Sequence, residues 1–213
     1  MKHNKWIDIS VTIKNGMAHW PGDRKVKITK LKDITKGSKN NLSGLSLGSH
    51  TGTHMDAPLH FFKRGKSLDR MPLSAVIGPA RVIEIKDKEC VRACELKKFK
   101  IKKEERILFK TWNSRKVKSS SFNKNFVYIS SEAANYLVRN NVQTVGVDCL
   151  SVGGFYKDGV TTHKILLKAG VWLIESLDLS QVKEGRYDLI CLPLKIFNSE
   201  GAPARAVVRS CNY

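Results

Sequence analysis

The stretch HTGTHMDAPLH, residues 50–60, holds three of the six histidines in this 213-residue chain, with an aspartate between the second and the third. The glycine, threonines and proline within the stretch disfavour a continuous helix. In an extended segment, His54 and Asp56 lie two residues apart on the same side of the chain. A bend at Gly52 can return His50 to that side. The stretch therefore predicts that these side chains converge.

The chemistry of this cluster points to a metal. Imidazole nitrogen and carboxylate oxygen, without a thiolate, suit Zn(II), Mn(II) or Fe(II) in a site that stays open to water. Isolated histidines in loops usually do no more than form hydrogen bonds. Such crowding in a histidine-poor chain instead favours metal binding or acid/base catalysis, and it makes His50, His54, Asp56 and His60 candidate site residues.

The composition is that of a globular protein, with 41% hydrophobic and 27% charged residues. We expect a single domain over residues 1–213, and no apolar run approaches the roughly 18 residues needed to cross a bilayer. The first sixteen residues, MKHNKWIDISVTIKNG, lack the apolar core of a secretory signal. Together with an odd number of cysteines, this predicts a cytoplasmic protein with reduced thiols.

The formal net charge of +19 suggests an acidic partner such as nucleic acid. The basic residues are, however, spread from Lys2 to Arg209, and the densest basic stretches do not interleave the aromatic side chains that stack on bases. The pattern therefore favours a solvated, lysine-coated surface over specific nucleic-acid binding.

Short β-type runs recur along the chain and few helices separate them. The runs are WIDISV (6–11), KVKITKL (25–31), LSGLSLG (42–48), ARVIEI (80–85), RILFKT (106–111), FVYIS (126–130), TVGVD (144–148), VWLIES (171–176), DLICLPL (188–194) and ARAVVRS (204–210). Helices are predicted at 130–141, capped by Ser130 or Ser131, at 162–170, closed by Gly170, and more briefly at 92–99. Residues 113–125 are predicted to form an exposed loop. The pattern indicates a mixed α/β or α+β domain with an extensive sheet.

At residues 50–60 the sequence resembles the cyclase family of metal-dependent hydrolases, which includes bacterial kynurenine formamidases (arylformamidases) and isatin hydrolase. The family signature is His-x-Gly-Thr-His-x-Asp-x-Pro-x-His, and every fixed position is met. Further segments are similar in the same order along nearly the whole chain. They are HWPGD (19–23), VGVDCLSVG (145–153), THKILLKAGVWLIESLDLS (162–180) and GAPARAVVR (201–209).

The resemblance implies roles for individual residues. His50, His54 and Asp56 match metal ligands, and His60 matches either a ligand of a second metal or the catalytic acid/base. Two distant residues, His163 and Glu175, match the pair that completes a two-metal site. The resemblance also implies a mixed-sheet β/β/α domain, one or two divalent ions, Zn(II) or alternatively Mn(II), and association into a homodimer or homotetramer.

The implied reaction is hydrolysis of a small aromatic amide, foremost N-formylkynurenine to kynurenine and formate, by metal-activated water. A flat substrate needs an apolar slot, for which Trp20, Phe61 and Phe155 are candidates. Two alternatives stay open: a hydrolase of another cyclic amide or an isatin-type ring, and a basic binding protein with a structural metal. Asp148 and Ser151 also match a family motif, but an aspartate that ends a strand commonly caps the next turn.

Overall fold

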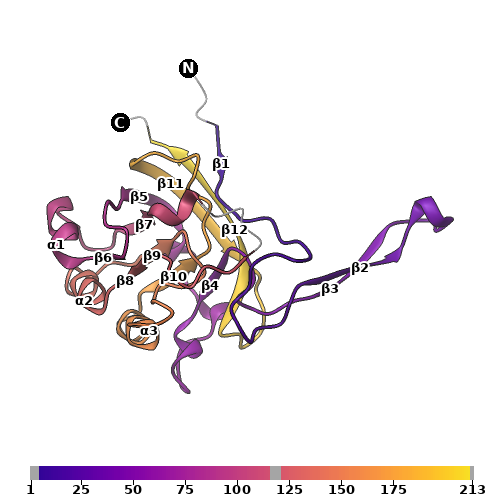
Figure 1. Ribbon diagram of the computed structural model, residues 1–213, viewed down its shortest axis with the longest axis horizontal. Helices are drawn as coiled ribbons and strands as arrows, with labels where there is room; N and C mark the ends of the chain where they lie inside the picture. The colour runs from indigo at the N-terminus through magenta and orange to yellow at the C-terminus, as the bar shows by residue number, and fades with distance from the viewer. Residues whose placement is uncertain (1–4, 116–120, 212–213) are drawn as a thin grey trace.

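The computed structural model describes residues 5–115 and 121–211 (Figure 1). The strands are β1 (Ile7–Asp8), β2 (Lys27–Lys32), β3 (Leu42–Ser46), β4 (His54–Asp56), β5 (Ile77–Glu84), β6 (Cys90–Val91), β7 (Arg106–Lys110), β8 (Tyr128–Ile129), β9 (Thr144–Val147), β10 (Trp172–Glu175), β11 (Gly185–Pro193) and β12 (Gly201–Ser210). The α-helices are α1 (Ala93–Leu96), α2 (Ser131–Arg139) and α3 (Gly159–Lys168). Short 3-10 helices lie between them, among them η2 (Pro58–His60).

A mixed eight-stranded sheet forms the body of the molecule, in the order β1-β12-β11-β5-β7-β9-β10-β4. Strands β5, β7, β9 and β10 run parallel, and the remaining pairings are antiparallel. Because β4 also pairs with β12, all strands of this sheet except β1 close into a ring. Closure satisfies the backbone groups that an open sheet edge would expose. The mixed-sheet prediction is thus confirmed, in the form of a barrel.

The two faces of the ring carry separate hydrophobic clusters. Side chains alternate along β7, so that Leu108 packs inside the ring while Ile107 and Phe109 pack beneath the helices. The same alternation on β4 and β10 puts Met55 and Ile174 inside. Their neighbours in the two strands must then point outward, toward the side of the ring that the helices cover.

The helices lie together on that outer side (Figure 1). Helix α2 begins at Ser130, whose side chain accepts a hydrogen bond from the Ala133 N–H, as the sequence predicted. Helix α3 begins at Gly159, three residues before the predicted start, because the residues of its first turn carry no apolar stripe that would reveal it. It ends before Gly170, which has a φ of +79°.

Strands β2 and β3 form an arm that projects from the ring on the side away from the helices (Figure 1). Only Asp33 is buried between Lys27 and Ser46. Large apolar side chains are exposed instead, at Leu31, Ile34, Leu42 and Leu45. A two-stranded hairpin without a core is marginal in water, and the described residues leave the apolar side chains of this arm uncovered.

Each predicted strand run contains a strand, and each predicted helix is present. The predicted exposed loop at 113–125 begins with a 3-10 helix, Trp112–Arg115, and residues 116–120 of it lie outside the described residues. In the part of the chain that is described, no helix is both long enough and apolar enough to cross a membrane.

Candidate metal centre

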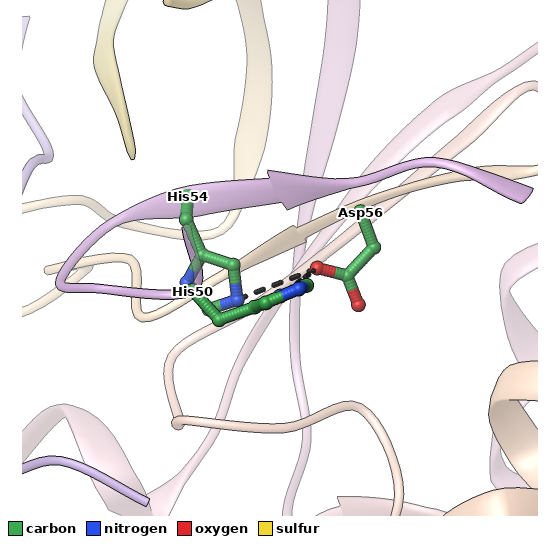
Figure 2. Close-up of side chains that lie close together, drawn as sticks. All are labelled: His50, His54 and Asp56. Atoms are coloured by element: carbon green, nitrogen blue, oxygen red, sulfur yellow. Dashed lines mark hydrogen bonds and ion pairs between the residues drawn. The ribbon is translucent and has the colours of Figure 1, made fainter. Parts of the chain in front are cut away.

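The histidine-rich stretch folds as the extended, bent segment that its sequence predicted. Strand β4 puts His54 and Asp56 on the same face, and Gly52 has a φ of +64°, which turns the preceding residues back toward them. The Nδ1 atom of His50 lies 2.8 Å from Oδ1 of Asp56 (Figure 2). The Nε2 atom of His54 lies 3.4 Å from the same oxygen. Three side chains from seven residues of chain therefore face one point.

The sheet pairing brings a second set of residues to this point. In the β4–β10 ladder, Glu175 stands opposite His54, so their side chains share the outer face of the ring. The Oε2 atom of Glu175 is 3.2 Å from Nε2 of His54, and its Oε1 atom is 3.2 Å from Nε2 of His163 on α3. The Nε2 atom of His163 is also 3.7 Å from Oδ2 of Asp56. Asp56 is therefore shared by two groups of possible metal ligands.

Backbone carbonyls fix the orientation of two of the imidazole rings. Nδ1 of His54 is 2.8 Å from the carbonyl oxygen of Gly52, and Nδ1 of His163 is 2.7 Å from that of Gly159. Each Nδ1–H must donate to its carbonyl, which leaves the Nε2 lone pair directed into the cluster. Metal-ligating histidines are commonly oriented in this way.

Unpaired buried atoms in the cluster indicate that these residues fit a divalent metal. Nε2 of His54 and Oδ2 of Asp56 face the cluster, are buried and have no hydrogen-bond partner among the described residues. Buried polar atoms without a partner cost free energy, and a bound cation would satisfy both of these atoms. Two overlapping groups offer ligand atoms within 4.8 Å of one another: His50, His54 and Asp56, and Asp56, His163 and Glu175. Nitrogen and oxygen donors of this kind suit Zn(II) or Mn(II).

Strong electrostatic coupling accompanies this crowding. Burial alone would lower the pKa of His54, but the carboxylates of Asp56 and Glu175, whose oxygens lie 3.4 and 3.2 Å from its Nε2 atom, raise it to about 10. Burial would raise the pKa of Asp56, yet His50 and His54 hold it well below its usual range. Without an ion, a proton on His54 thus takes the place of a cation between two carboxylates.

His60 stands beside this cluster without belonging to either ligand group. Its ring stacks against that of His50, with centroids 4.2 Å apart, and lies 6.0 Å from that of His163. Burial is the main cause that lowers the pKa of His60 below its ordinary value. The imidazole is therefore neutral at neutral pH and able to accept a proton.

The three aromatic residues predicted to form the substrate's apolar slot lie in two separate places. Phe61 packs against His60 and His163, with ring centroids 4.4 and 4.8 Å apart, and therefore lies at the metal cluster. Trp20 and Phe155 contact each other, with centroids 5.3 Å apart, and both contact Phe122. In the described part of the chain their rings contact one another and nearby aromatic residues, and the ammonium group of Lys124 lies 4.9 Å from the centroid of the Phe155 ring.

Comparison with known proteins agrees with this geometry. Residues 7–153 match the model of a family described as putative cyclase. The kynurenine formamidases of Bacillus thuringiensis (strain Al Hakam) and Bacillus anthracis are each 34% identical to this chain over 209 residues, which is 98% of this chain and 99% of theirs. The chain belongs to the cyclase family.

Solved structures show the same relationship in three dimensions. A potential metal-dependent hydrolase with cyclase activity is 30% identical and superposes with a TM-score of 0.85, covering 98% of this chain and 99% of the other. A protein from Bacillus stearothermophilus described as a predicted metal-dependent hydrolase is 31% identical, with a TM-score of 0.84 and coverage of 96% of this chain and 97% of the other. Isatin hydrolase A from Labrenzia aggregata, at 21% identity and a TM-score of 0.87, shares the cyclase fold over 98% of this chain and 94% of its own.

The family motif that contains Asp148 has a structural task in this cyclase-family chain. The Asp148 carboxylate accepts hydrogen bonds from the N–H and hydroxyl groups of Thr111 and Ser114, at 2.5 to 3.0 Å. It thereby joins the end of β9 to the turn after β7, and burial raises its pKa. In the same motif, the Val152 N–H donates to Oε1 of Glu175 at 2.6 Å. Sequence reasoning missed this contact, because a backbone donor leaves no signal in residue identity.

Proposed function

We propose that this cyclase-family protein is a metal-dependent amidohydrolase that cleaves N-formylkynurenine to kynurenine and formate, as one domain over residues 1–213. The observation that carries the proposal is the pair of ligand groups that share Asp56, with buried donor atoms left unpaired. The substrate is supported by the curated relatives that are named kynurenine formamidase and match over nearly their whole length. Kynurenine formation places the reaction in tryptophan catabolism.

We assign the ligands to two ions. His50, His54 and Asp56 would hold one ion, and Asp56, His163 and Glu175 would hold the other. A bound divalent ion lowers the pKa of water toward neutrality and polarises an amide carbonyl. Zn(II) is the proposed metal and Mn(II) the alternative, since both accept this donor set.

His60 is the proposed catalytic base. It is neutral and adjacent to His50, so it can accept the proton that the attacking water loses. The same imidazolium can then protonate the departing aryl amine. A weakly basic aniline leaves more readily than an alkyl amine, so a single imidazole meets the need. In the alternative role, His60 would be a further metal ligand.

The substrate's ring is proposed to lie against Phe61, which already packs beside His60 and His163. Trp20 and Phe155 are proposed as a more distant part of the same wall, because they form one aromatic cluster that packs on the core beneath the helices.

The test is hydrolysis of N-formylkynurenine by protein reconstituted separately with Zn(II) and Mn(II), followed by absorbance. A chelated sample and an isatin assay are the controls. Chelator-sensitive formation of kynurenine is expected with at least one metal. Turnover of isatin alone would replace the substrate assignment, and saturated metal binding without turnover of either compound would favour a structural metal.

We also propose a homo-oligomer, either a homodimer or a homotetramer. Two apolar surfaces of one chain support it: the arm, and the segment that joins β11 to β12. The exposed side chains are Leu31, Ile34, Leu42 and Leu45 on the arm, and Leu194, Ile196 and Phe197 on the segment, with Leu192 near the end of β11 beside them. In a two-fold pair each surface is used twice, and stable interfaces bury on the order of 1,600 Å² in total. A cytoplasmic location is supported by the five cysteines, all of which are free.

A further inference from the structure

Glu200 lies next to the metal cluster although no part of the histidine-rich motif contains it. Its backbone is anchored there, because its carbonyl accepts a 2.8 Å hydrogen bond from the N–H of Ala57, directly after β4. The carbonyl of the preceding residue, Ser199, likewise accepts a 2.8 Å hydrogen bond from the N–H of Leu68. Glu200 is thus held at the point where β12 begins and pairs with β4.

The Glu200 carboxylate is aimed at His50. Its Oε1 atom accepts a 2.5 Å hydrogen bond from the hydroxyl of Ser49 and lies 3.6 Å from Nε2 of His50. This Nε2 is buried and has no hydrogen-bond partner among the described residues. The distance is slightly too long for a hydrogen bond, so the contact is a close approach of a carboxylate oxygen to a ring nitrogen.

The His50 ring is otherwise tightly enclosed. A Cβ on Gly201 would stand 2.7 Å from Cε1 of His50, so only a glycine leaves room for the ring at that position. The ring of His60 stacks on it with centroids 4.2 Å apart. Its Nδ1 atom faces Asp56 at 2.8 Å. The ring therefore has one nitrogen toward the ligand group and the other toward Glu200.

The two other histidines of the centre show what that second nitrogen requires. His54 and His163 each direct one ring nitrogen to a backbone carbonyl and the other into the cluster. His50 has no such carbonyl in the described structure, and Glu200 occupies the equivalent position. A carboxylate that accepts the second N–H of a ligating histidine fixes its tautomer and raises its basicity.

We infer that Glu200, oriented by Ser49, is the positioning carboxylate of His50: it accepts the Nε2–H and presents Nδ1 to the ion beside Asp56. This inference rests on the proposed metal centre. It assigns His50 the opposite ligand nitrogen from His54 and His163. Glu200 acts through His50 and is not itself a ligand.

The experiment compares metal affinity, measured by competition with a chelator, in the wild-type protein and in Glu200→Ala and Glu200→Gln. The amide of glutamine can still accept from Nε2–H, whereas alanine cannot. We expect Glu200→Ala to weaken binding about 10- to 100-fold and Glu200→Gln only a few-fold. Glu84→Ala is the matched control, because the Glu84 side chain is also 41% exposed and lies on β5. Its affinity should equal that of the wild type.

A second readout is the visible absorption of the Co(II)-loaded protein, which reports the ligand geometry. Its bands should shift in Glu200→Ala and be restored in Glu200→Gln. Wild-type affinity in Glu200→Ala would overturn the inference, and so would a Gln variant as weak as the Ala variant, since that marks a direct ligand. If the wild type itself bound no metal, the proposed function would fail instead.

Discussion

Metal binding to this protein should release protons, because a proton on His54 occupies the position that a cation would take. Burial lowers the pKa of His54, but the adjacent carboxylates of Asp56 and Glu175 raise it to about 10. A histidine must lose its proton before it can ligate a metal. Below pH 10, each rise of one pH unit therefore makes this step about tenfold easier. Between pH 7 and pH 9, metal affinity should increase about 100-fold from His54 alone.

The pKa of His163 is also raised, mainly by Glu175 acting against burial, so its proton adds to the effect. The assay is chelator competition at several pH values, together with calorimetry in two buffers of different ionisation enthalpy to count the protons released. At least one proton per protein is expected at pH 8. An affinity independent of pH, with no proton released, would refute the reasoning.

The stability of the metal-free protein should change in the opposite direction. The pKa of His54 in the folded state, about 10, is above the ordinary value of 6.5. Its contribution is therefore fully present below pH 6.5 and is lost as the pH rises through 10. In that window the metal-free protein should lose on the order of 1 kcal/mol per pH unit from this group. Denaturant unfolding with and without metal measures the difference, and equal slopes with pH would contradict it.

Other substitutions separate the roles of individual residues. His60→Ala should keep its metal but lose about 10²- to 10⁴-fold in turnover, measured alongside metal content; loss of metal would instead make His60 a ligand. Gly146→Ala should lower the free energy of unfolding by about 1–3 kcal/mol without changing metal content, because its Cβ would stand 2.5 Å from Leu108 inside the ring; unchanged stability would show that the interior can relax. Asp148→Ala should cost about 3 kcal/mol in denaturant unfolding by leaving buried donors unpaired, and loss of turnover at full stability would assign it to catalysis. Leu45→Glu should shift the protein from dimer to monomer in light scattering, since this residue is 67% exposed on the arm; an unchanged mass would exclude the arm from the interface.

Much of the fold was predictable because its signals are local. Alternating apolar residues marked the strands, and the Ser130–Ser131 pair marked the start of α2, where Ser130 is the cap. The closure of the ring was not predictable, because it depends on β4, a strand of three residues that pairs with both β10 and β12. The early start of α3 was missed for a similar reason, since its first turn has no apolar pattern.

The sequence by itself determined the donor atoms of the centre. The residues from His50 to Asp56 are close along the chain, so an extended strand and one left-handed glycine are enough to make them converge. The family resemblance added His163 and Glu175 as matches, without their positions in space. The identity of these donor groups therefore follows from one short segment, in which the convergence of the side chains depends on backbone conformation alone.

Only the tertiary structure decided which distant residues join this segment at the site. The β4–β10 pairing puts Glu175 opposite His54, over 100 residues away in the chain, and α3 carries His163 to the same point. The β4–β12 pairing puts Glu200 beside His50. Such contacts depend on which strands become neighbours, and that choice is made by burying two hydrophobic clusters on opposite faces of one closed sheet. No local pattern in the sequence records it.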